Sequence, residues 1–384
     1  MISRKKISRR HFCRTGLSGA AGLTVPGMLP VTGALSIPGM LSAPGLLNGC
    51  GNSSDPLPPS GGITARVAAV KGIDLYKITL EALEAIGGIE MIVHEGETVF
   101  IKPNFVNLPW APYNQCFRMG ECTKTEIILA VAEECLRAGA RKVTIGEGSH
   151  LPTFDWKYAV TLDGERNLVS EAERLNGSYP GTVELACLET ESPGWHEVRS
   201  HTPHGKIAIS SLAAEADRVI SIPVAKTHSW AQLTLSAKNF LGITPLSRYA
   251  QLIDNTWWNR GSFDHRTPEA ISQVFLDITE ALQPDLAIVD FSIGLEGDGP
   301  TRDNGGRPVD MRKRTGSWAL LASTDLMAAD ATAARIMNHR VERISQLTMG
   351  FAMGLGEIRE GSIELAGEKI DNLQSDWKPA RLKG

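Results

Sequence analysis

Three consecutive polar side chains are the first feature that could do chemistry: Lys226, Thr227 and His228. They follow the β-branched run 219–222, which predicts a buried strand, and Pro223, which cannot donate a hydrogen bond in a central strand. We therefore expect the strand to end there and the three residues to occupy a loop at the sheet edge. In α/β proteins such loops bind ligands. The alternative is an ordinary solvated polar loop.

Two more lysines stand in similar surroundings. Lys102 follows the strand-like run 98–101, and Lys238 belongs to the segment 236–242, which ends in glycine. A lysine is a compact cation suited to phosphate or carboxylate, and it acts as a base only where desolvation lowers its pKa. We expect Lys102 and Lys226 to converge on one anionic group, although surface exposure is the commoner fate of lysines. The predicted substrate-binding residues are Lys102, Asn104, Thr227 and Asn239.

The predicted acid–base groups are two lysines and two histidines. His228 and His265 titrate near neutral pH and can move protons, but each can equally be a hydrogen-bonded structural residue. Together with Lys226 and Lys238 they form the predicted catalytic set. Proton abstraction beside a carboxylate, as in epimerisation or isomerisation, suits these groups.

Three acids accompany a Gly-rich stretch, 294–300. Asp290, Glu296 and Asp298 offer the hard oxygens that Mg²⁺ or Ca²⁺ prefers, and an added histidine would permit zinc or a transition metal. We therefore predict a divalent metal of unassigned identity on this loop. The alternative is a turn whose acids accept from backbone N–H groups. Two later acids, Asp325 and Asp330, are expected to cap a helix and to fix a lysine, respectively.

The elements that must position these residues alternate between strand and helix. The expected strands lie near 65–70, 98–101, 141–145, 183–188, 206–210, 219–222, 285–290 and 320–323. The expected helices lie near 74–86, 127–138, 166–175 and 268–282, with a capping box at 123–126. Residues 247–267 read as a long loop of the lid or ligand-binding kind. This pattern predicts an α/β fold with a layered, largely parallel sheet and helices on both faces, in a domain over 65–370 followed by a tail over 371–384.

The composition and the spacing of the cysteines argue against several classes of function. The formal net charge of −4 gives no electrostatic support for binding nucleic acid. Cys116 and Cys122 have neither zinc-knuckle nor ferredoxin spacing, so we expect no iron–sulfur cluster; a disulfide between them is one alternative. The chain also lacks the GxSxG, HExxH, P-loop and strand-linked GxGxxG motifs.

The first fifty residues are expected to form an export signal. Residues 8–12, Ser-Arg-Arg-His-Phe, resemble a twin-arginine motif ahead of a long apolar run, and 47–50 resemble a lipobox ending at Cys50. We expect passage through the twin-arginine export machinery, a lipid on Cys50 as membrane tether, a linker over 51–64, and a periplasmic or cell-envelope location. The alternative is ordinary cleavage that frees the protein. Prolines within the run disfavour a spanning helix.

The assembled motifs resemble the bacterial and archaeal family called domain of unknown function 362. The matching residues are 101–104, 139–140, 226–228, 238–242, His265, 288–290, 296–300, Asp325 and Asp330. They run in family order over most of residues 65–360. Some members also carry a ferredoxin-type cysteine cluster, which this chain lacks. The resemblance implies an architecture and a polar site, and no settled reaction.

The expected function is an exported α/β enzyme that acts on a small carboxylate or phosphate by acid–base chemistry, as an isomerase, an epimerase or a metal-assisted lyase. Two alternatives remain open. One is a redox protein that holds a flavin or another organic cofactor loaded before export. The other is a non-catalytic periplasmic protein that captures an anion with the same lysines.

Overall fold

The computed structural model describes residues 62–106, 115–151, 153–190, 194–253 and 256–383. The predicted signal peptide, the lipobox at Cys50 and most of the predicted linker therefore lie outside the described residues. Within the described part, no helix is both long and apolar enough to cross a bilayer.

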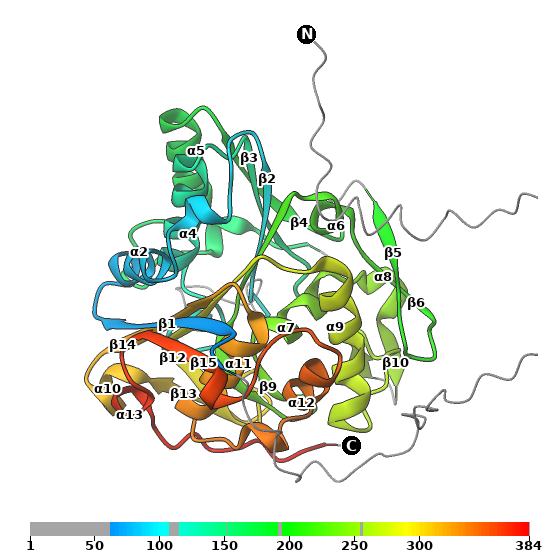
Figure 1. Cartoon of the computed structure of the whole chain (residues 1–384). Coiled ribbons are helices and arrows are strands. Elements are labelled where there is room, and N and C mark those ends of the chain that lie inside the picture. Colours follow the sequence, from blue (N-terminus) through cyan, green and yellow to red (C-terminus); the bar gives the residue numbers. More distant parts are fainter. Residues whose placement is uncertain (1–61, 107–114, 152, 191–193, 254–255, 384) are drawn as a thin grey trace, which may run out of the picture. The chain divides into compact units, whose positions relative to one another are not determined.

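An 11-stranded sheet forms the centre of the described domain (Figure 1). Its main path runs in the order β15-β1-β14-β12-β7-β2-β3-β4, and β13, β8 and β9 pair beside it. The strands are β1 (Ala65–Gly72), β2 (Thr98–Pro103), β3 (Lys142–Glu147), β4 (Thr182–Cys187), β7 (Arg218–Ile222), β8 (Val224–His228), β9 (Gln232–Thr234), β12 (Leu286–Gly297), β13 (Gly306–Asp310), β14 (Trp318–Ser323) and β15 (Ile363–Gly367). Two hairpins lie outside it: β5 (Trp195–Arg199) with β6 (Lys206–Ser210), and β10 (Gln251–Ile253) with β11 (Thr256–Trp258).

The sheet is mixed but largely parallel, as predicted. From β12 through β7, β2 and β3 to β4, each neighbouring pair is parallel. β14 runs antiparallel to both β1 and β12. Ligand-binding loops in such sheets gather beyond the carboxyl ends of the parallel strands. In this chain those ends carry Lys102 on β2 and Glu147 on β3.

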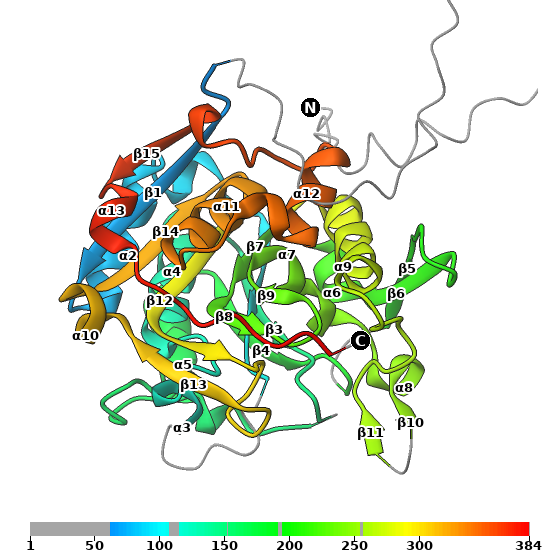
Figure 2. The same cartoon turned by 90° about the horizontal axis from the view of Figure 1, so that it is seen from below.

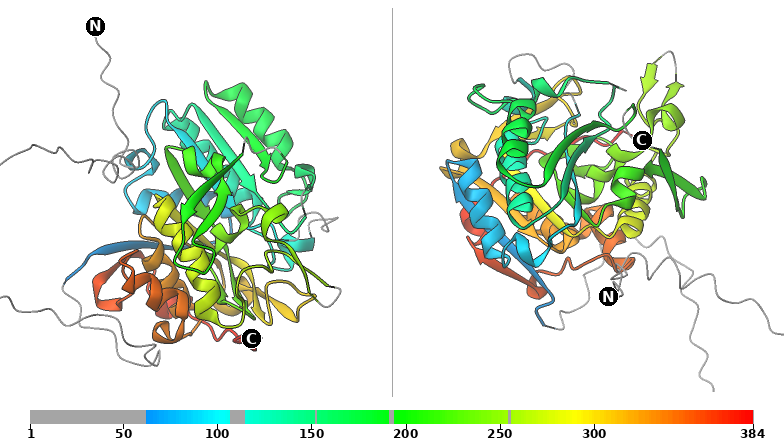
Figure 3. Two further views of the ribbon diagram at one scale, coloured as in Figure 1. Left: turned by 90° about the vertical axis from the view of Figure 1, so that its right-hand side faces the viewer. Right: turned by 90° about the horizontal axis from the view of Figure 1, so that it is seen from above.

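Helices cover both faces of the sheet, as predicted (Figures 1 and 3). One apolar core lies under α2 (Leu75–Ala85), α4 (Thr125–Arg137) and α5 (Leu168–Ser178). The other lies under α7 (Ser236–Asn239), α9 (Pro268–Leu282), α11 (Leu326–Ile336) and α12 (Ser345–Ala352). Shorter helices are α3 (Gln115–Arg118), α6 (Ser211–Glu215), α8 (Leu246–Tyr249), α10 (Met311–Thr315) and α13 (Ile370–Leu373), with 3-10 turns η1 (Ile89–Met91), η4 (Trp156–Tyr158), η5 (Phe240–Ile243), η6 (Val341–Arg343) and η7 (Glu360–Ser362).

The predicted loop at 226–228 is wrong, because these residues form a second strand. Pro223 does end β7, since it has no N–H to donate, but the chain resumes pairing one residue later as β8. β8 runs parallel to β12 and antiparallel to β9. At Pro223 the chain therefore passes from β7 to β8 within the same sheet. Lys226 and His228 are held in place by strand pairing.

Other strand ends also differ from expectation. β2 continues through Lys102 to Pro103, which pairs with Ile222 of β7. β12 continues past Asp290 to Gly297, so the predicted turn at 294–300 is mostly strand and pairs with β13. The predicted loop at 247–267 contains α8 and the β10–β11 hairpin.

One local prediction near residue 120 is also wrong, and one alternative that the sequence left open is not the one observed. The capping box at 123–126 does not form: the N-cap of α4 is Lys124, without a side-chain cap, while the Thr123 hydroxyl donates to the Ile222 carbonyl at 2.6 Å. Cys116 and Cys122 are buried free thiols in mutual hydrogen-bond contact, so the disulfide is not formed. Asp325, by contrast, caps α11 as expected by accepting from the Ala328 N–H.

Candidate functional site

A cavity of about 700 Å³ lies at the carboxyl ends of β2, β3 and β8. It collects seven of the eight residues predicted for catalysis or substrate binding: Lys102, Asn104, Lys226, His228, Lys238, Asn239 and His265. Thr227 is excluded because its side chain faces away, and its hydroxyl donates to the Gly297 carbonyl at 2.6 Å. Since side chains alternate along a strand, Lys226 and His228 share one side of β8 and Thr227 takes the other.

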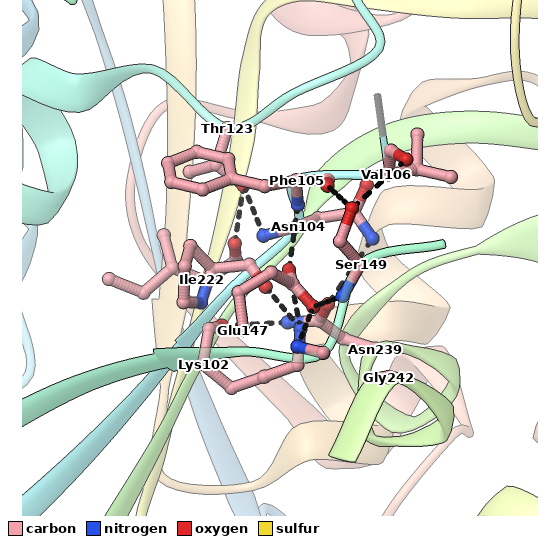
Figure 4. A network of polar contacts seen from close by, with 12 residues as sticks. Lys102, Asn104, Phe105, Val106, Thr123, Glu147, Ser149, Ile222, Asn239 and Gly242 are labelled. Carbon is pink, nitrogen blue, oxygen red and sulfur yellow. Dashed lines mark hydrogen bonds and ion pairs between the residues drawn. The ribbon is translucent and has the colours of Figure 1, made fainter. Parts of the chain in front are cut away.

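A buried ion pair between Lys102 and Glu147 forms one wall (Figure 4). Lys102 Nζ lies 2.7 Å from Glu147 Oε2 and 2.6 Å from the Pro103 carbonyl oxygen. Glu147 also accepts from the backbone N–H groups of residues 105, 148 and 149. Burial lowers the pKa of Lys102, and Glu147 opposes that effect. The glycine at position 242 allows a close approach to this wall, since a Cβ there would lie only 2.9 Å from Lys102 Nζ.

Two asparagines link Lys102 to Lys226. Lys226 Nζ donates to Asn104 Oδ1 at 2.6 Å and to the Glu121 carbonyl at 2.8 Å. Asn104 Nδ2 in turn donates to Asn239 Oδ1 at 3.3 Å, and Asn239 Nδ2 donates to the Lys102 carbonyl at 2.8 Å. Each amide orientation is therefore set by its partners. Burial lowers the pKa of Lys226 to about 8, so a substantial neutral fraction exists under mildly alkaline conditions.

Lys238 differs from the other two lysines. It lies on the one-turn helix α7, whose first N–H groups, from Ser236 and Ala237, donate to the buried carboxylate of Asp330. Asp330 thus positions Lys238 through the backbone and does not pair with a lysine, contrary to the prediction. Within the described part of the chain, Lys238 Nζ has no hydrogen-bond or ion-pair partner. Burial, with the charges of Lys226, Arg260 and Lys102, lowers its pKa to about 7.

The two histidines have opposite, fixed tautomers. His228 Nδ1 accepts from the N–H groups of Trp230 and Ala231, at 3.1 and 3.3 Å, so its proton is on Nε2. His265 Nδ1 lies 2.8 Å from the Phe263 carbonyl, which can only accept, so its Nε2 is the free base. Burial, then the charges of Lys238 and Lys226, lower the pKa of His228 well below 6.5. Burial also lowers the pKa of His265.

The lining residues that the sequence analysis missed include the charged side chains of Glu147, Arg260 and Lys383. Glu147 is the last residue of β3 and stands between two glycines in the sequence, a signal that would have found it. The guanidinium of Arg260 donates to the carbonyls of Ser149, Gly242 and Thr244, and so joins its own segment to the end of η5 and to the loop after β3. Among the described residues that line the cavity, five are lysine or arginine and one, Glu147, is acidic.

Lys383 reaches the cavity on an extended strap, residues 374–383, which we name the C-terminal strap. Figure 2 shows this segment leaving α13 and passing in front of β12 and β8. Glu296 accepts from the Lys378 N–H, and Asp298 forms an ion pair with Arg381 at 2.6 Å. Lys383 N–H donates to the Ser229 carbonyl, and its ammonium lies over the Trp230 ring.

The predicted metal set is corrected by these contacts. Glu296 and Asp298 anchor the strap, while Asp290 lies in the core and forms an ion pair with Lys124 at 3.2 Å, both side chains being fully buried. Glu296 also forms an ion pair with Arg314 at 2.8 Å, so each carboxylate has its own cationic partner and the three do not converge. Across the residues that the structure describes, the one group of three side chains close enough to hold an ion is His201, Asp277 and Glu280, outside the cavity.

The fold and the cavity define a mixed α/β protein with a buried cationic site. The chain belongs to the family described as Domain of unknown function (DUF362), whose model matches residues 99–335. It is 27% identical over 248 residues to "Thylakoid-associated protein sll1697" from Synechocystis sp. (strain ATCC 27184 / PCC 6803 / Kazusa). That match covers 65% of this chain and 65% of the relative, so this chain spans just under two-thirds of the relative's length.

Two solved structures have partial similarity. The lactate racemase apoprotein from Thermoanaerobacterium thermosaccharolyticum matches with a TM-score of 0.33 and 15% identity, over 60% of this chain and 50% of that one. A structural genomics target from Thermotoga maritima matches with a TM-score of 0.34 and 13% identity, over 63% and 56%. Similarities of this size do not identify a reaction.

Proposed function

We propose that this protein is an enzyme that acts on a small carboxylate or phosphate by acid–base chemistry. The observation that carries the proposal is the composition of one cavity: five cations, three of them buried, face one acid and three histidines, of which His228 and His265 have opposite tautomers. Buried cations without matching acids are costly unless an anion compensates them. The cavity is therefore suited to an anionic ligand.

The roles follow from the hydrogen bonds. Lys226, oriented by Asn104, and Lys238, which has no protein acceptor within the described residues, attract the anion. His265 offers its free Nε2 as a general base. His228 offers an N–H donor to the oxygen on which charge develops, and it does not serve as the base, because protonating Nδ1 would break two backbone hydrogen bonds.

Hydrogen–deuterium exchange tests this reaction class before a product is known. The protein is incubated in D₂O with a panel of small carboxylates, and loss of the proton beside each carboxyl group is followed by ¹H NMR. We expect exchange with at least one compound and a loss of roughly 10²–10⁴-fold in His265→Gln. The control His94→Gln changes an exposed residue. Anion binding without exchange would instead support the non-catalytic binding protein.

A second candidate is supported by the cavity volume. About 700 Å³ lies within the range of roughly 300–1,000 Å³ that holds drug-sized ligands, so an organic redox cofactor also fits. A visible absorption band in purified protein would support it. Elemental analysis of the same sample tests for a divalent ion; the proposed acid–base roles assign no step to one.

We propose further that the protein is exported by the twin-arginine route and tethered through Cys50. The support is the arginine pair and the lipobox-like residues of the sequence. Fractionation of cells that express the natural chain tests it: Arg9→Lys with Arg10→Lys should retain the protein inside, and Cys50→Ala should release it from the membrane fraction. Unchanged fractions would contradict the proposal.

A further inference from the structure

The lysines of the cavity differ in how their amines are engaged. Lys102 Nζ has two oxygen acceptors, one of them the Glu147 carboxylate, and Lys226 Nζ also has two. Lys238 Nζ has none among the described residues. Hydrogen bonds from a charged ammonium group are stronger than those from a neutral amine, so deprotonation weakens them. Lys238 has no such bonds to weaken. Of these three lysines, Lys238 is therefore the one best able to exist as a free amine; the fourth, Lys383, is exposed and holds its ammonium over the Trp230 ring.

The position of this amine is nevertheless well defined. Lys238 stands between Ala237, whose N–H donates to Asp330, and Asn239, whose side chain donates to the Lys102 carbonyl and to Ser221 Oγ. The backbone on both sides is thus tied to buried groups, and the side chain projects into the cavity. An anchored backbone with an uncommitted amine is the arrangement that a lysine nucleophile needs.

We propose that Lys238 Nζ forms an imine with the carbonyl carbon of an α-keto acid bound in this cavity. The inference rests on the proposed anion-binding function, because the neighbouring cations would hold the carboxylate. A cationic neighbour that keeps a lysine neutral is a recognised way to activate it, and the pKa of Lys238 is lowered to about 7 by burial, Lys226, Arg260 and Lys102.

The step is balanced without an oxidant or a reductant. The amine nitrogen attacks the carbonyl carbon, its lone pair forms the N–C bond, and the carbonyl oxygen takes up a proton while the nitrogen loses one. The C–O bond then breaks, and the hydroxyl leaves as water with the second amine hydrogen. His265 Nε2 can accept and return the proton, and His228 Nε2–H can donate a hydrogen bond to the oxygen.

The imine also explains why a lysine nucleophile would accompany a base. A protonated imine withdraws electrons from the carbon next to it, so removal of a proton from that carbon becomes easier. His265, in the same cavity, is the group that would receive this proton. The α-keto acid is thus the substrate class that uses the cations, the amine and the histidines together.

Reductive trapping tests the proposal. The folded protein is incubated with pyruvate and sodium cyanoborohydride, and the alkylated lysines are mapped by peptide mass spectrometry. Exposed Lys157, paired with Asp155, is the internal reference. We expect at least tenfold more alkylation at Lys238 than at Lys157 near pH 7, with that ratio falling as pH approaches the pKa of exposed lysines, about 10.4. Sulfate should slow the labelling of Lys238 and leave that of Lys157 unchanged.

Variants and binding data separate the two proposals. Lys238→Arg should remove the Lys238 adduct, and Lys157→Arg should leave it unchanged; peptide mapping of the unaltered protein stands even where a variant fails to fold. Sulfate binding measured by calorimetry, together with no excess labelling of Lys238, would overturn the imine and leave the anion site intact. Neither binding nor labelling would overturn both.

Discussion

His228 and His265 line one cavity and use the same ring nitrogen, Nδ1, in opposite roles toward their backbone partners. His228 accepts two N–H groups at Nδ1, whereas His265 donates from Nδ1 to a carbonyl oxygen. The same residue type thereby supplies a hydrogen-bond donor at one point and a base at another. Trp230 lies between them, with its ring 5.7 Å from that of His228 and 6.4 Å from that of His265.

Nitrogen NMR will show two tautomers. In long-range ¹H–¹⁵N spectra at pH 7.5, His228 should appear with a protonated Nε2 and His265 with a protonated Nδ1, because their backbone partners permit only these forms. The variants His228→Gln and His265→Gln assign the signals. A protonated Nδ1 on His228 would contradict the hydrogen bonding described above.

Acid will destabilise the protein partly through His228. Its folded pKa lies well below 6.5, so as pH falls through about 6.5 the unfolded chain binds a proton that the folded protein does not. The free energy of unfolding should therefore decrease in acid, and the decrease between pH 7 and 5 should be shallower in His228→Gln. Urea unfolding at several pH values measures it. His94→Gln, at an exposed site, should keep the full slope.

Anion affinity will weaken in alkali. Lys238 and Lys226 lose their protons around pH 7 and 8, respectively, so sulfate should bind progressively less tightly as pH rises through these values. Lys238→Met should reduce affinity roughly tenfold at pH 6, about 1.4 kcal/mol, and remove the first step of the pH profile. Lys157→Met is the control for charge alone. An unchanged pH profile in Lys238→Met would rule out its role in holding the anion. Calorimetry provides the measurement.

The Lys124–Asp290 pair will prove structural. Lys124→Met leaves a fully buried carboxylate without its cation and should lower the free energy of unfolding by about 3–5 kcal/mol. The matched control is Lys142→Met, which breaks a partly exposed pair with Glu184 and should cost less than about 1 kcal/mol. Equal losses in the two variants would contradict this difference.

The C-terminal strap will loosen when its ion pair is removed. Arg381 is mostly exposed, so Asp298→Asn should leave the thermal midpoint nearly unchanged while trypsin cleaves after Arg381 several-fold faster. Sulfate affinity should fall toward that of Lys383→Ala. Asp155→Asn, which breaks an exposed pair elsewhere, should affect neither result. Unaltered cleavage in Asp298→Asn would show that other contacts hold the strap.

The sequence singled out residues that the structure places around one cavity, although it misjudged the elements that carry them. Lys226 and His228 were identified from residue type after a β-branched run, and that inference does not depend on whether they occupy a strand or a loop. Pairing of β8 with β12 depends on contacts far along the chain, which a local pattern does not contain. The secondary structure predicted for residues 226–228 was therefore wrong, although their residue types still indicated a polar site.

For the three acidic residues, by contrast, closeness in sequence was misleading. Asp290, Glu296 and Asp298 are close in sequence and oxygen-rich, which suggested a metal. Their partners Lys124, Arg314 and Arg381 come from distant segments, and only the folded chain reveals that each carboxylate is already neutralised. Arg260 was missed for the same reason, since its role is defined by three carbonyls from other segments.

The cavity is lined by Lys102, from the second strand of the described domain, and by Lys383, its last described residue. A partly folded chain that lacks either segment has no complete site, so a ligand that uses both will bind the fully assembled protein and stabilise it by mass action. Retention on an immobilised anion would then report correct folding. Preparations containing misassembled molecules can be purified on that basis, without knowledge of the natural ligand.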